Sequence, residues 1–207
     1  STISFPPGAR YRIDSELLIK DRNGLTFQGN GATTFSANQD PGDRPMWWFV
    51  RGSGLALRDL TIVGANPNAG IQLGSYVIAN EHQHGVDARG VLGLVLDGLT
   101  ITDTYGDFIY LGGDDGLSRW NRNVTITNST FRRNGRQGIT LNAVNNVTIA
   151  NNEMSDARMS CIDIEPPRGF GARNVFIHDN HFGSHKLPFF AAEGIPGSIG
   201  TNIWVER

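Results

Sequence analysis

The chain has 207 residues, of which 39% are hydrophobic and 18% charged, with 26 glycines and a formal net charge of −2. This glycine-rich, charge-poor composition favours strands and turns, and the small net charge argues against a nucleic-acid partner. No apolar run approaches the roughly 18 residues that a membrane-spanning helix needs, so no membrane span is expected. A single cysteine, Cys161, excludes an internal disulfide and is predicted to be a buried structural thiol.

A short motif recurs along the whole chain. Each copy begins with glycine or asparagine and continues with an apolar, a variable and a second apolar residue. The copies are residues 24–27, 54–57, 93–96, 123–126, 146–149, 174–177 and 202–205. Apolar residues that alternate with a period of two are typical of strands, and stacked copies bury a common core. The motif therefore predicts a solenoid built from strands.

Two further strands accompany each copy of the motif. A polar corner follows it, beginning at Asp59, Gly98, Asn128, Asn151 and Asp179, and then a third apolar position at Ile62, Ile101, Phe131, Met154 and Phe182. Asn and Asp tolerate left-handed backbone geometry, and stacked amides can form a ladder. Another short strand precedes each copy, at 17–20, 47–50, 86–89, 109–112, 139–142, 162–165 and 190–193. The sequence thus predicts an all-β, single-stranded right-handed parallel β-helix of about seven rungs with three short strands each.

We expect residues 1–207 to form one parallel β-helix domain. The last copy of the motif lies next to Arg207, although a solenoid needs a polar cap over its final rung. The expectation is that the protein continues beyond Arg207, or that a partner or a second copy covers this end.

Alignment of the preceding strands places their outward residues in columns on one face. The first column is Leu18, Trp48, Asp87, Tyr110, Thr140, Asp163 and Ala191, and the next is Lys20, Val50, Arg89, Gly112, Asn142, Glu165 and Glu193. A flanking column at the turn before the strand holds His84, Asp107, Gln137 and Ser160, with His82 and Arg136 close by. Such a mixture of rings, carboxylates, amides and guanidinium groups suits the binding of sugars.

The predicted catalytic site lies on this face, because acid–base chemistry needs two or more titratable groups that converge. The predicted catalytic residues are His82, His84, Asp87, Arg89 and Asp107. The predicted substrate-binding residues are Trp48, Tyr110, Arg136, Gln137, Thr140, Asn142, Asp163 and Glu165. The carboxylate pairs Asp163–Glu165 and Glu165–Glu193 are alternative catalytic pairs or, through their oxygens, ligands for Ca²⁺. Nothing in the spacing requires a metal.

The layout resembles the pectin-lyase-like superfamily of β-helix carbohydrate enzymes and phage depolymerases across nearly the whole chain. Polygalacturonases carry Asn-Thr-Asp, Asp-Asp and Gly-His-Gly at the turn before this strand on successive rungs. The corresponding segments here are 82–84, 106–107 and 136–138, where Asp107 and Gly138 match. Residues 85–89, Gly-Val-Asp-Ala-Arg, are similar to the Gly-Phe-Asp-Pro-His signature of mannuronan C5-epimerases. Asp87 matches that signature, and Arg89 replaces its histidine.

The resemblance implies a secreted or cell-surface protein with a polysaccharide partner, and it leaves two classes of function open. The first is an enzyme acting on an acidic, uronate-containing polysaccharide as a lyase, an epimerase or a glycoside hydrolase. Elimination or epimerisation would use Arg89 or Arg136 against the uronate carboxylate and His84, His82 or Tyr110 as the base. Hydrolysis would use Asp87 and Asp107 as the carboxylate pair. The second class is a non-catalytic spike, adhesin or surface module that binds glycan.

Overall fold

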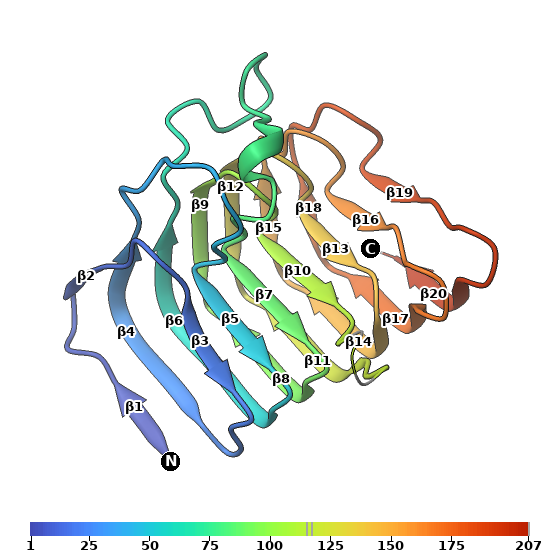
Figure 1. Ribbon diagram of the computed structural model, residues 1–207, viewed down its shortest axis with the longest axis horizontal. Coiled ribbons are helices and arrows are strands. Elements are labelled where there is room, and N and C mark those ends of the chain that lie inside the picture. The colour runs from blue at the N-terminus through green and yellow to red at the C-terminus, as the bar shows by residue number, and fades with distance from the viewer. Residues whose placement is uncertain (115, 117, 207) are drawn as a thin grey trace.

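The computed structural model describes residues 1–114, 116 and 118–206, and its strands wind into coils that stack side by side (Figure 1). The described residues form two sheets, and the paired strands in both are parallel. The smaller sheet has the order β3-β5-β7-β10-β13-β16-β19. Its strands are β3 (Leu17–Lys20), β5 (Trp47–Val50), β7 (Val86–Arg89), β10 (Ile109–Gly112), β13 (Ile139–Leu141), β16 (Ile162–Ile164) and β19 (Phe190–Ala192). These are the strands predicted to precede each copy of the motif.

The larger sheet contains the motif and the strand that follows it. Its strands are β1 (Thr2–Ser4), β2 (Arg10–Arg12), β4 (Thr26–Phe35), β6 (Ser53–Val63), β8 (Leu92–Asp97), β9 (Thr100–Thr104), β11 (Asn121–Thr127), β12 (Thr130–Asn134), β14 (Val144–Ala150), β15 (Glu153–Ser155), β17 (Gly171–His178), β18 (His181–Phe182) and β20 (Ile199–Val205). β4 and β6 run unbroken around the polar corner, whereas later coils divide there into two strands. β6 accordingly pairs with β8 along its first half and with β9 along its second. The parallel β-helix predicted from the sequence is confirmed.

The glycine or asparagine that begins each motif occupies a left-handed backbone position. The φ values are 62° at Gly24, 57° at Gly54, 73° at Gly93, 56° at Asn123, 63° at Asn146, 51° at Asn174 and 53° at Asn202. The polar corners behave alike, with positive φ at Asp59, Gly98, Asn128, Asn151 and Asp179. Glycine and asparagine enter this region at low cost. The repeat therefore marks two of the places where each coil turns.

The apolar residues of the motif fill the interior of the coil. Leu94, Val124 and Val147 pair in register along β8, β11 and β14, and all are buried. The third apolar position also stacks in register, from Ile62 through Phe131 to Phe182. Cys161 is buried as predicted, and burial raises the pKa of its thiol to about 12, so it is an inert part of the core.

A buried amide ladder holds the later corners together. The Asn152 amide donates to the Ile126 carbonyl at 3.0 Å and to Asn180 Oδ1 at 2.9 Å, while its own oxygen accepts from the Ser129 N–H at 3.0 Å. Because Asn152 is buried, alanine would leave the Ser129 N–H and the Ile126 carbonyl without partners.

We expect Asn152→Ala to lower the free energy of unfolding by about 2–3 kcal/mol, measured by urea denaturation. Glu153→Ala, at the exposed neighbouring residue, is the control and should change it by no more than about 0.5 kcal/mol. Equal stability of the two variants would contradict a role for the ladder.

The longest insertion lies between β6 and β7 and rises above the coils at the top of the view, near the middle of the stack (Figure 1). It contains the short 3-10 helix η1 (Ile78–Asn80) and is anchored to later coils. The Gly70 N–H donates to the Asn134 carbonyl at 2.9 Å, and the Asn66 amide donates to the Ser75 carbonyl at 2.9 Å and the Thr104 carbonyl at 3.4 Å. This insertion brings new polar residues to the edge of the smaller sheet.

Candidate functional site

The outward positions of the smaller sheet form the first column predicted from the sequence. Trp48 pairs with Asp87, Asp87 with Tyr110, Tyr110 with Thr140 and Thr140 with Asp163. Leu18 and Ala191 continue the column at its two ends. The register therefore brings these predicted residues together on successive strands.

The same positions are far less exposed than we predicted. Asp87, Thr140 and Asp163 are each at most 1% exposed, although they were expected to lie on an open polar face. Neighbouring side chains cover them: the Arg89 guanidinium donates to both oxygens of Asp87, and Thr140 donates its hydroxyl to Asp107 Oδ2 at 2.7 Å. Alternation along a strand gives the side on which a residue lies, but it does not show what covers that side.

The flanking column forms a hydrogen-bonded ladder from one coil to the next. His84 Nδ1 accepts from the Asp107 N–H at 2.9 Å, and Asp107 Oδ1 accepts from the Gln137 N–H at 3.0 Å. Gln137 Oε1 in turn accepts from the Ser160 N–H at 2.9 Å. Each side chain thus accepts a hydrogen bond from a buried backbone N–H of the next coil. These three side chains therefore stabilise the stack of coils.

His84 is buried in this ladder and does not face solvent, contrary to our expectation. Its ring stacks on Tyr110, with ring centroids 4.9 Å apart. Burial, then the charges of Arg136, His82 and Arg89, holds the pKa of His84 well below its usual range, so the ring is neutral. Since Nδ1 already accepts a hydrogen bond, Nε2 carries the proton and His84 is not placed to take one from a substrate.

Asp107 is equally buried and is held by several donors. Arg136 Nη1 lies 3.1 Å from both of its oxygens, in addition to the contacts with Thr140 and Gln137. Burial raises the pKa of Asp107, while Arg136 and the hydrogen bonds act in the opposite direction. Asp107 therefore positions Arg136, and no face of its carboxylate is open to a substrate.

Arg136 brings together three carboxylates from three parts of the chain. Besides Asp107, its Nε lies 3.6 Å from Glu81 Oε2 and its Nη2 lies 3.5 Å from Glu165 Oε2. These carboxylates raise the pKa of Arg136, so its guanidinium stays charged. The Glu81 side chain is 25% exposed and the Glu165 side chain 39% exposed. Two carboxylates that solvent reaches therefore flank one guanidinium.

Glu81 and Glu165 differ in their surroundings. Glu81 accepts from the Tyr76 hydroxyl at 2.6 Å, which raises the pKa of Tyr76, and lies 3.8 Å from His82 Nε2. Glu165 follows β16 and lies two residues after Asp163. Burial, and next the charge of Glu165, raises the pKa of Asp163 to about 7. Asp163 consequently keeps its proton close to neutral pH.

The raised pKa of Asp163 gives a prediction for stability. An unfolded aspartate releases its proton near pH 4, whereas folded Asp163 keeps its proton until about pH 7. The folded state therefore binds more protons between these values, and Asp163 makes it progressively less stable as the pH rises. Relative to Asp163→Asn, the wild-type protein should lose roughly 2–4 kcal/mol of unfolding free energy between pH 4 and pH 7.

Urea denaturation of both proteins across this pH range measures the difference. Asp43→Asn, which changes an exposed carboxylate, is the control and should follow the wild-type curve. If the unfolding free energies of the wild type and Asp163→Asn change with pH in the same way, the prediction is wrong and Asp163 has the pKa of an ordinary aspartate.

Arg89 lies between two aromatic rings next to an open hollow. Its guanidinium carbon is 6.0 Å from the centre of the Trp48 ring and 5.4 Å from the centre of the Tyr110 ring. The hollow has a volume of about 330 Å³ and is lined by Trp48, Arg89, Lys20 and Arg51, among others. The Asn142 amide donates to the Tyr110 hydroxyl at 3.4 Å. Rings and cations here form a platform that suits an acidic sugar.

Of the five predicted catalytic residues, His82 is the most exposed. Its side chain is 47% exposed, that of Arg89 is 33% exposed, and His84, Asp87 and Asp107 are buried. Sequence reasoning missed Glu81 and Tyr76, although both lie in the long insertion immediately before His82. The position of Glu81 next to the predicted cluster was the one available signal.

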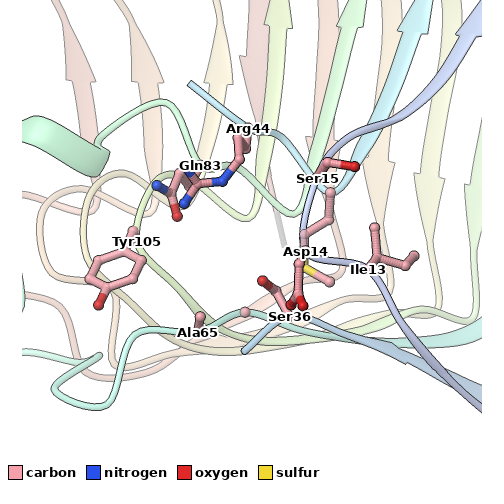
Figure 2. A pocket seen from close by; sticks show the side chains of 10 residues that line it. Ile13, Asp14, Ser15, Ser36, Arg44, Ala65, Gln83 and Tyr105 are labelled. Carbon is pink, nitrogen blue, oxygen red and sulfur yellow. The ribbon is translucent and has the colours of Figure 1, made fainter. Parts of the chain in front are cut away.

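A separate polar cavity lies near the first coils. Figure 2 shows Asp14, Arg44, Gln83 and Tyr105 around it. Its volume of about 10 Å³ is room for roughly one water molecule, so it is no substrate site.

The described residues contain no group of three or more His, Cys, Asp or Glu side chains arranged to hold a metal ion. None of the helices in this part of the chain has the length and apolar character to cross a membrane.

Comparison with known families identifies the fold family. Residues 51–195 match the family model described as the right-handed beta helix region, and the chain belongs to this family. A search of curated proteins gave no match.

Proposed function

We propose that the protein cleaves glycosidic bonds in an acidic, uronate-containing polysaccharide bound along the outer face of the smaller sheet. The observation that carries this proposal is the pair of partly exposed carboxylates, Glu81 and Glu165, on either side of Arg136. Because both contact one guanidinium, their nearest oxygens lie no more than about 9.5 Å apart, which does not exceed the largest carboxylate separation used by glycoside hydrolases. This pair takes the place of Asp87 and Asp107, which are buried.

Their surroundings assign a different role to each carboxylate. Glu165 lies two residues after Asp163, whose raised pKa of about 7 keeps a proton beside Glu165 near neutral pH, so Glu165 suits the general acid that passes a proton to the leaving oxygen. Glu81 accepts a hydrogen bond from the Tyr76 hydroxyl and lies beside His82, which is exposed. Glu81 is thus assigned as the general base that activates the attacking water. Arg136 fixes the distance between Glu81 and Glu165.

The platform at Trp48, Arg89 and Tyr110 supports binding of the sugar chain. It lies on the same face as Glu165, on strands β5, β7 and β10 of the smaller sheet. Lys20 in the adjoining hollow favours a carboxylate group on the sugar. A polysaccharide of this kind would be met outside the cell, which fits a secreted or surface protein.

The proposal is tested by incubating the protein with polygalacturonate, alginate and hyaluronan, and with dextran as the neutral control. Two products are measured: new reducing ends, and unsaturated sugars by their absorbance. An active wild-type protein should release reducing ends without unsaturated product. Glu165→Gln and Glu81→Gln should each lower kcat at least about 100-fold, the usual contribution of acid–base catalysis. Glu193→Gln, a carboxylate predicted in the same column as Glu165, is the matched control and should retain wild-type kcat.

Unsaturated product would contradict hydrolysis, and unchanged turnover in both variants would contradict the assignment of the site. Binding without any turnover would instead support the second candidate, a non-catalytic glycan-binding module. The aromatic platform around Arg89 is the observation that favours that candidate.

A further inference from the structure

A second hollow lies where the chain leaves the smaller sheet and enters the larger one. It has a volume of about 480 Å³, and its lining includes Arg51, Ser53, Arg119, Trp120 and Arg122. None of these residues belongs to the Glu81–Arg136–Glu165 site. Arg51 also lines the hollow beside Trp48, so the two hollows are neighbours.

Two backbone hydrogen bonds between Asp114 and Arg119 close the segment that carries Arg119. The Asp114 N–H donates to the Arg119 carbonyl at 3.0 Å, and the Arg119 N–H donates to the Asp114 carbonyl at 3.2 Å. Gly90 lies beneath this segment, where a Cβ atom would meet the Cβ of Arg119 at 3.0 Å and that of Asp114 at 3.2 Å. A glycine at this position therefore lets Arg119 lie close to the coil wall.

Charge in the hollow comes mainly from two arginines. Arg51 donates to Asp21 and Asp114, which neutralise it. Arg119 and Arg122 are exposed, and within the described part of the chain no carboxylate forms an ion pair with either. Asp21 interacts with Arg119 only through its charge, so two exposed guanidinium groups face the hollow without an ion pair to any described carboxylate.

Trp120 supplies a ring surface next to these charges. Its ring packs against Phe170, with centroids 5.9 Å apart, and the Arg173 guanidinium carbon lies 5.0 Å from its centre. Arg173 and Arg122 occupy the same column of the larger sheet, each paired with Asn145. Phe170 and Arg173 therefore hold the Trp120 ring in place at the wall of the hollow.

We propose that this hollow binds an acidic oligosaccharide through its carboxylate or sulfate groups, at a site separate from the carboxylate pair. Guanidinium groups bind planar and tetrahedral oxyanions through paired hydrogen bonds, and the indole ring stacks on a sugar. A single ring and a net charge of −2 suit a nucleic acid less, since nucleic-acid binding uses extended basic tracks with repeated stacking platforms.

Calorimetric titration with a galacturonate hexasaccharide and a heparin-derived hexasaccharide at low salt tests this site and separates carboxylate from sulfate. The wild type should bind at least one of them, and more weakly as salt is added. Arg119→Ala/Arg122→Ala should weaken that binding at least about tenfold. Arg12→Ala/Arg132→Ala, which removes two exposed arginines from strands β2 and β12, should bind as the wild type does.

Three results would overturn the proposal: no binding of either hexasaccharide, wild-type affinity in Arg119→Ala/Arg122→Ala, or tighter binding of single-stranded DNA of equal charge. The titration needs no turnover. A protein that cleaves no glycan yet binds one through Arg119 and Arg122 would thus contradict the proposed hydrolysis and support this second site.

Discussion

Replacing Asp107 with alanine is expected to lower the free energy of unfolding by about 3–5 kcal/mol. The substitution removes the carboxylate that accepts from the Arg136 guanidinium, the Thr140 hydroxyl and the Gln137 N–H. The Thr140 hydroxyl and the Gln137 N–H are buried and would lose this partner without replacement, and Arg136 would keep only its longer contacts with Glu81 and Glu165. Urea denaturation at pH 7 measures the loss.

Glu165→Gln is the matched control, because Glu165 contacts the same guanidinium from its exposed side. Its free energy of unfolding should stay within about 1 kcal/mol of the wild type, as for exposed ion pairs. Asp107→Ala as stable as the wild type would mean that Asp107 is dispensable for the fold. It would also reopen the catalytic role first predicted for Asp107.

Ile149→Asp is expected to abolish folding altogether. Ile149 is fully buried in β14, in register with Ile126 and Ile177 of the neighbouring strands. A carboxylate there would have no partner, and its burial costs more than about 5 kcal/mol, a large part of the stability of a typical domain. Circular dichroism of the purified variant should show no cooperative thermal transition.

Thr148→Asp tests whether this effect belongs to the interior. Thr148 is the neighbouring residue on the opposite side of β14 and is only partly buried. It should give a cooperative transition within a few degrees of the wild type, as expected for surface changes. Folding of Ile149→Asp, or unfolding of both variants, would contradict the assigned orientation of β14.

The fold could be predicted because each coil repeats the same local requirements. Asn123 and Asn146 recur where the backbone turns left-handed, and Val124 and Ile126 alternate into a shared core. A period of two fixes the orientation of every strand residue relative to that core. Register followed from aligning these positions, so Trp48 and Asp163 were placed in one column correctly.

The site was less predictable, because burial on the outer face depends on contacts that the repeat does not encode. His84 and Asp107 lie at turns, where the side chain can bend along the stack and bond to the next coil. The insertion that carries Glu81 has no counterpart in the other coils. Its hydrogen bond to Asn134 could therefore not be predicted from the repeat. The predicted column of His84, Asp107 and Gln137 was therefore correct in position, but its exposure was wrong.

Arg136 illustrates the same limit. It was predicted to contact substrate, yet it lies among Asp107, Glu81 and Glu165, and its side chain is 17% exposed. Asp107 and Glu165 belong to the repeating coils, whereas Glu81 belongs to the insertion between β6 and β7. The carboxylate pair proposed to be catalytic thus combines one regular coil position with one residue of an insertion.

A crystal structure of the Glu165→Gln variant soaked with hexagalacturonate tests directly whether an acidic glycan binds at the Glu81–Arg136–Glu165 site. We expect the sugar chain along the outer face of the smaller sheet, with one glycosidic oxygen beside residue 165 and sugar rings on Trp48 or Tyr110. Sugar bound to the larger sheet alone, with no contact to Arg136 or residue 165, would contradict the proposed function of this site.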